Sequence, residues 1–241
     1  MASNGFQFKQ FYVRHDKCAM KVGTDGVLLG ILAPVDGYNS SNARILDVGT
    51  GSGLVALMIA QRCQKAQIDA IDIDSAAVEQ AKENFTASPW ANNLQVYQTR
   101  MQDWNPDYKY DLIVSNPPYF QNSLKNPEKG RQLARHTDTL SYNELFAHSA
   151  QLLKKDGEFV VILPAEAETE VRGLAAAERL SLTHVTHVFS KEGKSARRVL
   201  LCFAKGIENQ ESIVRIDSLV LEDEKGGRSL PYQTLTKDFY L

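Results

Sequence analysis

The chain of 241 residues carries 27 lysines and arginines against 29 aspartates and glutamates, which gives a formal net charge of −2. With 43% hydrophobic and 23% charged residues, its composition is that of an ordinary globular protein, and its length is compatible with one large domain and a sizeable core. Because the overall charge supplies no attraction to nucleic acid, such a partner would have to be bound by a local basic patch.

Cysteine and histidine usage indicates neither a disulfide framework nor a zinc site. The three cysteines, Cys18, Cys63 and Cys202, are odd in number and far apart, which fits a reducing compartment. The five histidines show no metal-ligand spacing. There is no apolar segment of a signal peptide after the first residues and no run of about 20 apolar residues. We therefore predict a cytoplasmic protein, a monomer, without membrane or metal association.

Residues 6–30 begin with closely spaced aromatic residues, which predict a β-hairpin whose rings lie in the core, followed by a short helix from about Asp25. Thr24 or Asp25 is the expected N-cap of that helix. The turn at residues 23–26 joins a small polar loop to the helix start, where a ligand's amino or carboxylate end can be held. Thr24 and Asp25 are therefore candidate ligand contacts. We treat residues 1–30 as an extension of a single domain that covers residues 1–241.

A glycine-rich turn follows the buried strand that starts at Arg44 and precedes a helix at residues 54–60. Its glycines allow unusual backbone angles and close approach of a ligand; they are Gly49, Gly51 and Gly53. The order G-x-G-x-G departs from the dinucleotide fingerprint, which would have its third glycine at Leu54. With Asp47 two positions before the first glycine, the turn resembles the first motif of class I S-adenosylmethionine-dependent methyltransferases. A tight structural turn is the alternative.

A second predicted strand ends in Asp72, whose carboxylate can accept hydrogen bonds from both ribose hydroxyls of a nucleoside cofactor. Asp72 follows the glycine turn at about the expected distance of 20 residues, which argues against a merely solvated acid. We expect Asp74 to interact with the macrodipole of the next helix, and Ser75 to cap that helix over residues 76–87.

The segment from Tyr110 to Tyr119 is an apolar, β-branched strand that ends at Asn116-Pro117-Pro118-Tyr119. The prolines remove two backbone donors and hold the neighbouring carbonyls rigidly. The side-chain oxygen of Asn116 and the carbonyl of Pro117 could accept hydrogen bonds from a planar amino group, and Tyr119 could stack on that group. This tetrapeptide resembles the signature of amino-group methyltransferases that modify adenine N6, cytosine N4 or a glutamine amide. A strand followed by a proline turn is the alternative.

Two loops are rich in cations. The loop after Tyr119 has a single acid, Glu128, and its cations are Lys125, Lys129, Arg131 and Arg135. A second loop joins two strands near the C-terminus, and its candidate phosphate contacts are Lys194, Arg197 and Arg198. Solvated loops are the alternative, but the first loop lies immediately beside the candidate catalytic turn.

The second half of the chain completes the predicted fold. A capping box at Ser141-Tyr142-Asn143-Glu144 opens a helix, and a strand at residues 157–164 and a helix at residues 166–179 follow. Strands at residues 182–189 and 199–204 have a short connection, so they should pair antiparallel, and residues 213–221 could add an outer strand. We predict an α/β fold, a Rossmann-like sheet of the class I methyltransferase type. This sheet is mostly parallel, with one antiparallel strand at the C-terminal hairpin and helices on both faces.

The motifs and their order resemble, over nearly the whole chain, the bacterial family of tRNA(Val)-specific adenine-N6 methyltransferases. The segments that carry this resemblance are residues 8–11, 18–26, 116–119 and 235–241. The resemblance implies transfer of a methyl group from S-adenosylmethionine to N6 of adenine 37 in the anticodon loop, with the tRNA as partner. It also implies that Asp103 accepts a hydrogen bond from the adenine amino group of the cofactor. It assigns recognition of the adenine amino group to Asn116 and Pro117, and it also places Asn116 among the residues that bind the cofactor.

Three other functions remain open from the sequence. A glutamine methyltransferase of a translation release factor uses the same tetrapeptide but usually has a helical N-terminal domain, for which few residues precede Asp47. A DNA adenine methyltransferase would need a target-recognition domain. A non-enzymatic nucleoside-binding module would keep the glycine turn and Asp72 but would not require Asn116.

Overall fold

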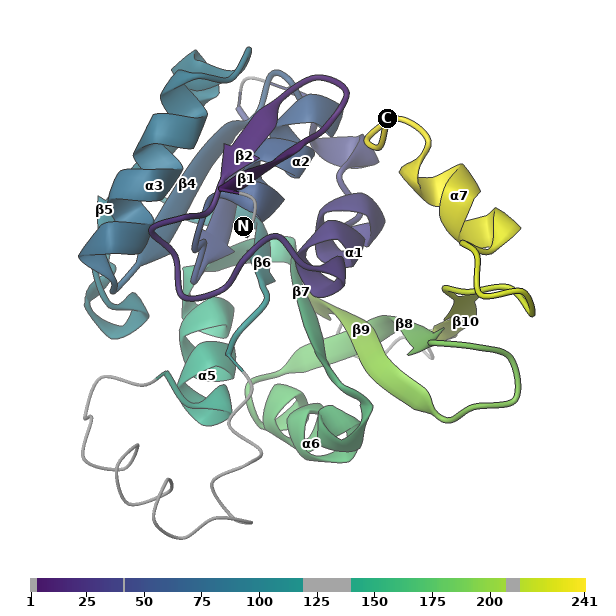
Figure 1. The fold of residues 1–241 in the computed structure, drawn as a ribbon. Coiled ribbons are helices and arrows are strands. Elements are labelled where there is room, and N and C mark those ends of the chain that lie inside the picture. The colour runs from purple at the N-terminus through teal and green to yellow at the C-terminus, as the bar shows by residue number, and fades with distance from the viewer. Residues whose placement is uncertain (1–3, 41, 119–139, 207–212) are drawn as a thin grey trace, which may run out of the picture.

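The computed structural model describes residues 4–40, 42–118, 140–206 and 213–241, and its centre is an eight-stranded sheet (Figure 1). The strand order is β10-β8-β9-β7-β6-β3-β4-β5. The strands are, in chain order, β3 Arg44–Val48, β4 Gln67–Asp72, β5 Leu94–Gln98, β6 Tyr110–Ser115, β7 Leu153–Pro164, β8 Leu180–Phe189, β9 Ala196–Lys205 and β10 Arg215–Val220.

The predicted direction of the strands is confirmed. β9 is antiparallel to both of its neighbours, β7 and β8, and the other neighbouring strands run parallel. The short connection at residues 190–195 does not allow a crossover, so β8 and β9 form a hairpin. β10 adds the expected outer strand and pairs parallel with β8. Because β3, β4 and β6 are parallel, the turns that follow them lie at one edge of the sheet.

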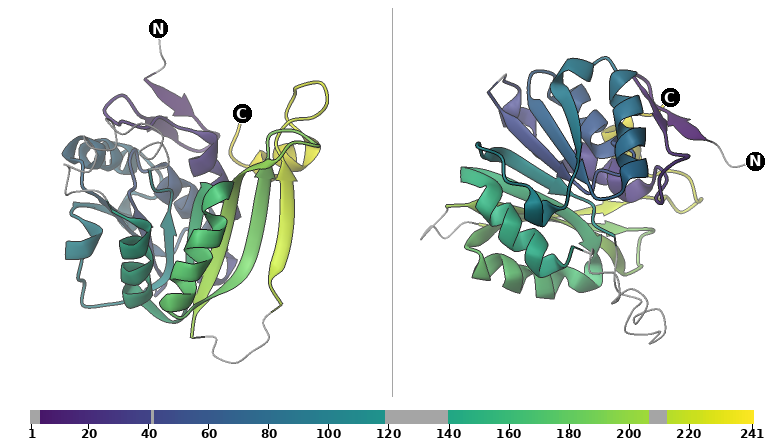
Figure 2. Two further views of the ribbon diagram at one scale, coloured as in Figure 1. Left: turned by 90° about the horizontal axis from the view of Figure 1, so that it is seen from below. Right: turned by 90° about the vertical axis from the view of Figure 1, so that its left-hand side faces the viewer.

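Helices cover both faces of the sheet (Figure 2). The helices are α1 Thr24–Leu32, α2 Leu54–Arg62, α3 Ser75–Thr86, α5 Tyr142–Leu152, α6 Glu168–Ala177 and α7 Leu230–Thr236. The short 3₁₀ segments are η1 Asp36–Tyr38, η2 Ala91–Asn93, η3 Met101–Asp103 and η4 Ala165–Ala167. Ile45 packs into the core cluster that includes α1 and α2, whereas its neighbour Leu46 packs into the cluster that includes α5 and α6. This alternation is why the central strands are apolar on both faces.

The two ends of the chain pack against each other. β1, Gly5–Gln7, and β2, Tyr12–Arg14, form the predicted N-terminal hairpin as a separate antiparallel pair. The ring of Phe8 is stacked on that of Tyr240, with centroids 5.9 Å apart, and the Lys9 amide donates to the Phe239 carbonyl over 2.8 Å. Phe8 is fully buried, as expected for an aromatic residue of the core.

Two helix caps differ from the prediction. The N-cap of α1 is Gly23, without a side-chain hydrogen bond, so neither Thr24 nor Asp25 caps this helix. Both residues lie in the first turn of α1 instead. The N-cap of α3 is Asp74, whose carboxylate accepts from the Ala76 amide, and Ser75 is the first helical residue. The predicted capping box at Ser141 is present.

Within the described ranges, no helix is long and apolar enough to cross a membrane.

Candidate active site

Two adjoining cavities lie at the edge of the sheet where β3, β4 and β6 end. The larger has a volume of about 410 Å³ and the smaller about 340 Å³. Both are lined by Met20, Gly49 and Gly51, so the glycine turn and the N-terminal segment form parts of the walls of both. Volumes of this order are typical of small-molecule sites, and the carboxyl edge is where open α/β sheets bind ligands.

The glycine turn is shaped for close approach of a ligand. Gly49 and Gly51 have φ values of 70° and 55°, and a Cβ atom at either position would meet no atom within 4 Å. The backbone therefore faces open space in the cavities at these two positions, and any side chain there would project into that space. Gly53 has another role, because a Cβ atom there would lie 2.4 Å from Cε1 of Phe85. It allows α3 to pack closely against the start of α2.

Asp47 stabilises the glycine turn through hydrogen bonds of its side chain. Its side chain is buried, and its Oδ2 atom accepts from the Thr50 hydroxyl over 2.7 Å and from the Ala56 amide over 3.2 Å. Burial raises the pKa of Asp47 to about 7, although both hydrogen bonds act in the opposite direction. A positively charged ligand in the smaller cavity, which Asp47 lines, would favour the ionised carboxylate.

Asp72 lies at the end of β4 in the larger cavity, where the sequence places it. Its Oδ2 atom accepts from the Gly51 amide over 2.9 Å and its Oδ1 atom from the Asp74 amide over 3.0 Å. Burial raises its pKa, against the effect of these backbone hydrogen bonds. The carboxylate is thus held in one orientation while retaining acceptor capacity for hydroxyl groups.

The rest of the larger cavity is mainly apolar. The apolar side chains that line it include Val48, Ile71, Ile73, Met101 and Leu140. An apolar slot beside a fixed carboxylate suits a nucleoside, whose base has two flat faces and whose ribose carries two neighbouring hydroxyls.

The proline turn after β6 lies where the two cavities meet. Asn116 lines the smaller cavity, whereas Pro117 and Pro118 line the larger. The Ser115 hydroxyl donates to the Val48 carbonyl over 3.0 Å, which ties the end of β6 to the end of β3. The acceptor pair predicted for an amino group, Asn116 and Pro117, is therefore held beside the glycine turn. Tyr119 lies outside the described residues.

The first turn of α1 closes the smaller cavity opposite the glycine turn. Thr24 and Asp25 both line it, as the sequence suggests. The Asp25 carboxylate accepts a charged hydrogen bond of 2.9 Å from Nε of Arg198, a residue of β9. Arg198 also lines this cavity. The guanidinium of Arg198 is thus directed to Asp25 of α1, and its contact with a nucleic acid stays a prediction.

Asp103 does not lie among the residues that line the larger cavity. Its side chain is two-thirds exposed and is 3.9 Å from the guanidinium of Arg100. Its neighbours Met101 and Gln102 line the cavity instead. The 3₁₀ turn of η3 explains the difference, since it directs consecutive side chains to different sides. Met20 is a wall residue that sequence reasoning did not single out, although it lies within the segment 18–26 that carries the family resemblance.

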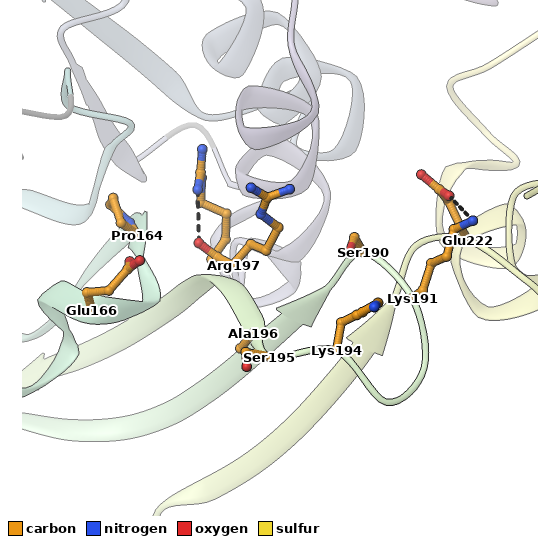
Figure 3. Close-up of a pocket in the computed structure, with 10 residues that line it drawn as sticks. Pro164, Glu166, Ser190, Lys191, Lys194, Ser195, Ala196, Arg197 and Glu222 are labelled. Atoms are coloured by element: carbon orange, nitrogen blue, oxygen red, sulfur yellow. Dashed lines mark hydrogen bonds and ion pairs between the residues drawn. The ribbon is translucent and has the colours of Figure 1, made fainter. Parts of the chain in front are cut away.

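A third, more open cavity of about 810 Å³ lies along the β8–β9 hairpin. Figure 3 shows Lys194 and Arg197 along it, and Lys191 joined to Glu222 by an ion pair of 3.4 Å. Arg198 lines both this cavity and the smaller one beside the glycine turn. The cations predicted at Lys125, Lys129, Arg131 and Arg135 lie outside the described residues.

The fold and the site together define a class I methyltransferase that uses S-adenosylmethionine. The sheet has β9 as its antiparallel strand, the glycine turn is open to a cavity, and an acid ends the next strand. The model for the family "Methyltransferase small domain" matches residues 27–177, and the chain belongs to this family.

Within that class, the chain belongs to the family of tRNA1(Val) (adenine(37)-N6)-methyltransferases. A relative of that name from Parabacteroides distasonis is 49% identical over 100% of this chain and 99% of its own. Another from Bacteroides thetaiotaomicron is 45% identical, with the same coverage. One from Pectobacterium carotovorum is 45% identical over 99% of this chain and 94% of its own.

Solved structures share the fold at much lower identity. A predicted O-methyltransferase from Agrobacterium tumefaciens has a TM-score of 0.68 at 17% identity, covering 89% of this chain and 96% of its own. A geranyl diphosphate C-methyltransferase from Streptomyces coelicolor A3(2), in complex with S-adenosyl-L-homocysteine, has a TM-score of 0.52 at 12% identity, covering 74% and 77%. These likenesses extend the agreement in fold to methyltransferases of other kinds.

Proposed function

We propose that this protein transfers a methyl group from S-adenosylmethionine to N6 of adenine 37 in the anticodon loop of tRNA1(Val). The observation that carries the proposal is the position of Asn116 and Pro117, an acceptor pair for an amino group, at the junction of the two cavities. Membership in a family named for this reaction supports the substrate and the atom.

We assign the two ends of the cofactor to different cavities. We assign the adenosine to the larger cavity, with the ribose hydroxyls on Asp72 and the base against the apolar wall that includes Ile73. We assign the methionine end to the smaller cavity, between the glycine turn and the residues Thr24 and Asp25. The empty space beside Gly49 and Gly51 supports close passage of the cofactor over the turn. Asp103 stays a prediction without support from this arrangement.

Bound S-adenosylmethionine supplies a sulfonium methyl group that is already electrophilic. The protein has to place the adenine amine in line with that group, and orientation of this kind is worth roughly 7 to 11 kcal/mol. Asn116 and Pro117 accept hydrogen bonds from the two N–H groups and orient the nitrogen. These acceptors would also stabilise the positive charge that develops on the nitrogen while the new N–C bond forms and the S–C bond to the departing S-adenosylhomocysteine breaks, and the nitrogen would then lose one proton to water. Stacking of the base on Tyr119 remains the prediction from the sequence.

Adenine 37 can reach this site at modest energetic cost. It lies in a single-stranded loop, and extruding an unpaired base costs only a few kcal/mol. We place the reaction in the cytoplasm, which the three free cysteines, Cys18, Cys63 and Cys202, support.

The direct test is transfer of labelled methyl groups to unmodified tRNA, total protein and duplex DNA in parallel, followed by nucleoside analysis. We expect N6-methyladenosine at position 37 of tRNA1(Val), and none in a transcript with guanosine at that position. Label on protein alone would make the substrate a glutamine amide, and label on DNA would make it a DNA adenine; either result overturns the proposal.

We further propose that the exposed cations of the β8–β9 hairpin, Lys194 and Arg197, contact tRNA phosphates. Phosphate contacts make binding salt-dependent, and each lost contact lowers the slope of log K against log salt by about 0.7 to 0.9. We therefore expect the double variant Lys194→Glu/Arg197→Glu to bind tRNA more weakly and with a shallower slope, while S-adenosylhomocysteine binds with unchanged affinity.

The matched control is Lys82→Glu, a charge reversal at an exposed residue of α3, a helix that packs against β5 at the other end of the sheet. It should leave the salt slope unchanged. An unchanged slope in the double variant would place the phosphate surface elsewhere.

A further inference from the structure

We propose that Arg198 is a positioning residue of the cofactor site, which holds the Asp25 carboxylate against the ammonium group at the methionine end of S-adenosylmethionine. The inference rests on the proposed placement of that end in the smaller cavity. It assigns Arg198 to the cofactor rather than to the tRNA, and it assigns the two neighbouring arginines of β9 to different ligands.

The contact joins parts of the chain that are 173 residues apart. Nε of Arg198 donates to Oδ2 of Asp25 over 2.9 Å, and one terminal nitrogen of Arg198 donates to the Arg197 carbonyl over 2.9 Å. Two hydrogen bonds therefore fix the plane of the guanidinium. Because the guanidinium is rigid, its hydrogen bond to Asp25 also fixes the orientation of that carboxylate.

Partial burial separates this ion pair from the Lys191–Glu222 pair of the same hairpin. The exposed fractions of the Arg198 and Asp25 side chains are 30% and 24%, whereas those of Lys191 and Glu222 are 47% and 45%. Water screens a pair less as its exposure falls, so the Arg198–Asp25 contact constrains its partners more than an exposed pair does.

Strand geometry explains why Arg197 and Arg198 differ. Arg198 lies two residues before Leu200, which packs into the core cluster that includes α1, whereas Arg197 lies at an irregularity in the register between β8 and β9. Arg197 is exposed along the hairpin cavity (Figure 3), whereas Arg198 lines the wall that this cavity shares with the smaller one. A basic dipeptide that suggests one phosphate surface in the sequence thus serves two sites.

Asp25 is the better placed of the two carboxylates that line the smaller cavity. Asp47 is buried, and its Oδ2 atom already accepts from Thr50 and Ala56 within the glycine turn. Asp25 lies in the first turn of α1, whose N-cap Gly23 makes no side-chain hydrogen bond. The amino-acid end of the cofactor carries both an ammonium and a carboxylate. A carboxylate side chain beside the backbone N–H groups of an uncapped helix start matches both charges.

The test compares two ligands that differ only at that end. S-adenosylhomocysteine carries the amino acid group, and 5′-methylthioadenosine has the same adenosine and sulfur without it. We expect Arg198→Gln to weaken binding of S-adenosylhomocysteine about tenfold, because a positioned hydrogen bond to a charged group is lost. Binding of 5′-methylthioadenosine, measured by calorimetry in the same way, should stay within twofold. Equal weakening of both ligands would indicate a merely structural role and overturn the inference.

The variants Asp25→Asn and Asp25→Asn/Arg198→Gln complete a double-mutant cycle. If Arg198 acts through Asp25, the double variant binds S-adenosylhomocysteine no more weakly than Asp25→Asn alone. Independent, additive losses would mean that Arg198 contacts the ligand directly and would contradict a positioning role. Arg198→Lys keeps the positive charge but lacks the planar guanidinium. It should therefore bind S-adenosylhomocysteine more tightly than Arg198→Gln but more weakly than the natural protein.

Two controls separate this inference from the proposed function. Lys154→Gln removes an ion pair of similar geometry, 2.8 Å with exposed fractions of 40% and 22%, toward the amino ends of β6 and β7, and should change neither affinity. Affinity of Arg198→Gln for tRNA should be unchanged, and a loss there instead of in cofactor binding would return Arg198 to the phosphate surface. Because the cofactor measurements need no tRNA, they stand whatever the methylated substrate is.

Discussion

Aspartates are held differently toward the two edges of the central sheet. Toward the amino ends of the strands, Asp69 is buried, and its Oδ2 atom accepts from the hydroxyls of Tyr108 and Tyr110, each over 2.8 Å. The indole of Trp104 donates in turn to the Tyr110 hydroxyl over 3.0 Å. At the carboxyl edge, Asp72 accepts instead from backbone amides of the turns that surround a cavity.

The difference shows how the same residue type serves stability or ligand binding. Side chains that donate to a carboxylate are themselves part of the core, and the cluster raises the pKa of Tyr108 to about 12, chiefly through burial and then through its hydrogen bond to Asp69. Backbone amides of a turn fix a carboxylate without filling the space before it. The carboxyl edge can therefore present Asp72 to a ligand, whereas two tyrosine hydroxyls occupy the Oδ2 atom of Asp69.

The largest effect is expected at the carboxyl edge for Asn116→Ala. This change removes one of the two proposed acceptors for the amine, and loss of one preorganised polar group in an active site costs about 10²- to 10³-fold in kcat. Single-turnover transfer to tRNA measures the loss, while the Kd for S-adenosylhomocysteine should be largely kept. An unaltered transfer rate would remove Asn116 from the mechanism.

A pH-dependent effect of a few kcal/mol is expected for Asp47→Asn. Burial raises the pKa of Asp47 to about 7 in the folded protein, from an ordinary value of 3.8. Between these values the folded state binds more protons than the unfolded state, so the contribution of Asp47 to stability falls as pH rises from about 4 to about 7. The asparagine side chain of the variant does not titrate, so the variant lacks this pH-dependent loss of stability.

Urea unfolding across that pH range measures this difference. The free energy of unfolding of Asp47→Asn, minus that of the natural protein, should increase as the pH rises. A constant difference would contradict a raised pKa at this position.

The smallest of these effects is expected at the amino edge for Tyr110→Phe. The variant removes one hydrogen bond to Asp69 and leaves the Trp104 indole without its acceptor, which should lower the free energy of unfolding by about 1 to 3 kcal/mol. Cofactor affinity should not change. Tyr12→Phe, a change at a residue 44% exposed, is the matched control and should stay within about 0.5 kcal/mol. Weaker cofactor binding in Tyr110→Phe would show that the two edges are coupled.

Local patterns in the sequence were sufficient to predict the strands, the glycine turn and the position of Asp72. Each depends on residues close together in the chain: apolar runs buried on both faces, glycines that adopt positive φ, and an acid at the end of the next strand. The proline turn after Ser115 and the direction of β9 followed in the same way, from prolines that end a strand and from a connection too short for a crossover.

The directions of individual side chains depend on contacts between parts of the chain that are far apart in the sequence. The 3₁₀ turn directs Asp103 outward, toward Arg100, and Gly23 and Asp74 cap helices for which other residues were expected. The sequence groups Arg198 with the predicted phosphate contacts, and the structure pairs it with Asp25 of α1. Its partner Asp25 is 173 residues away, and no local pattern records which face of a strand will meet a helix from the other end of the chain.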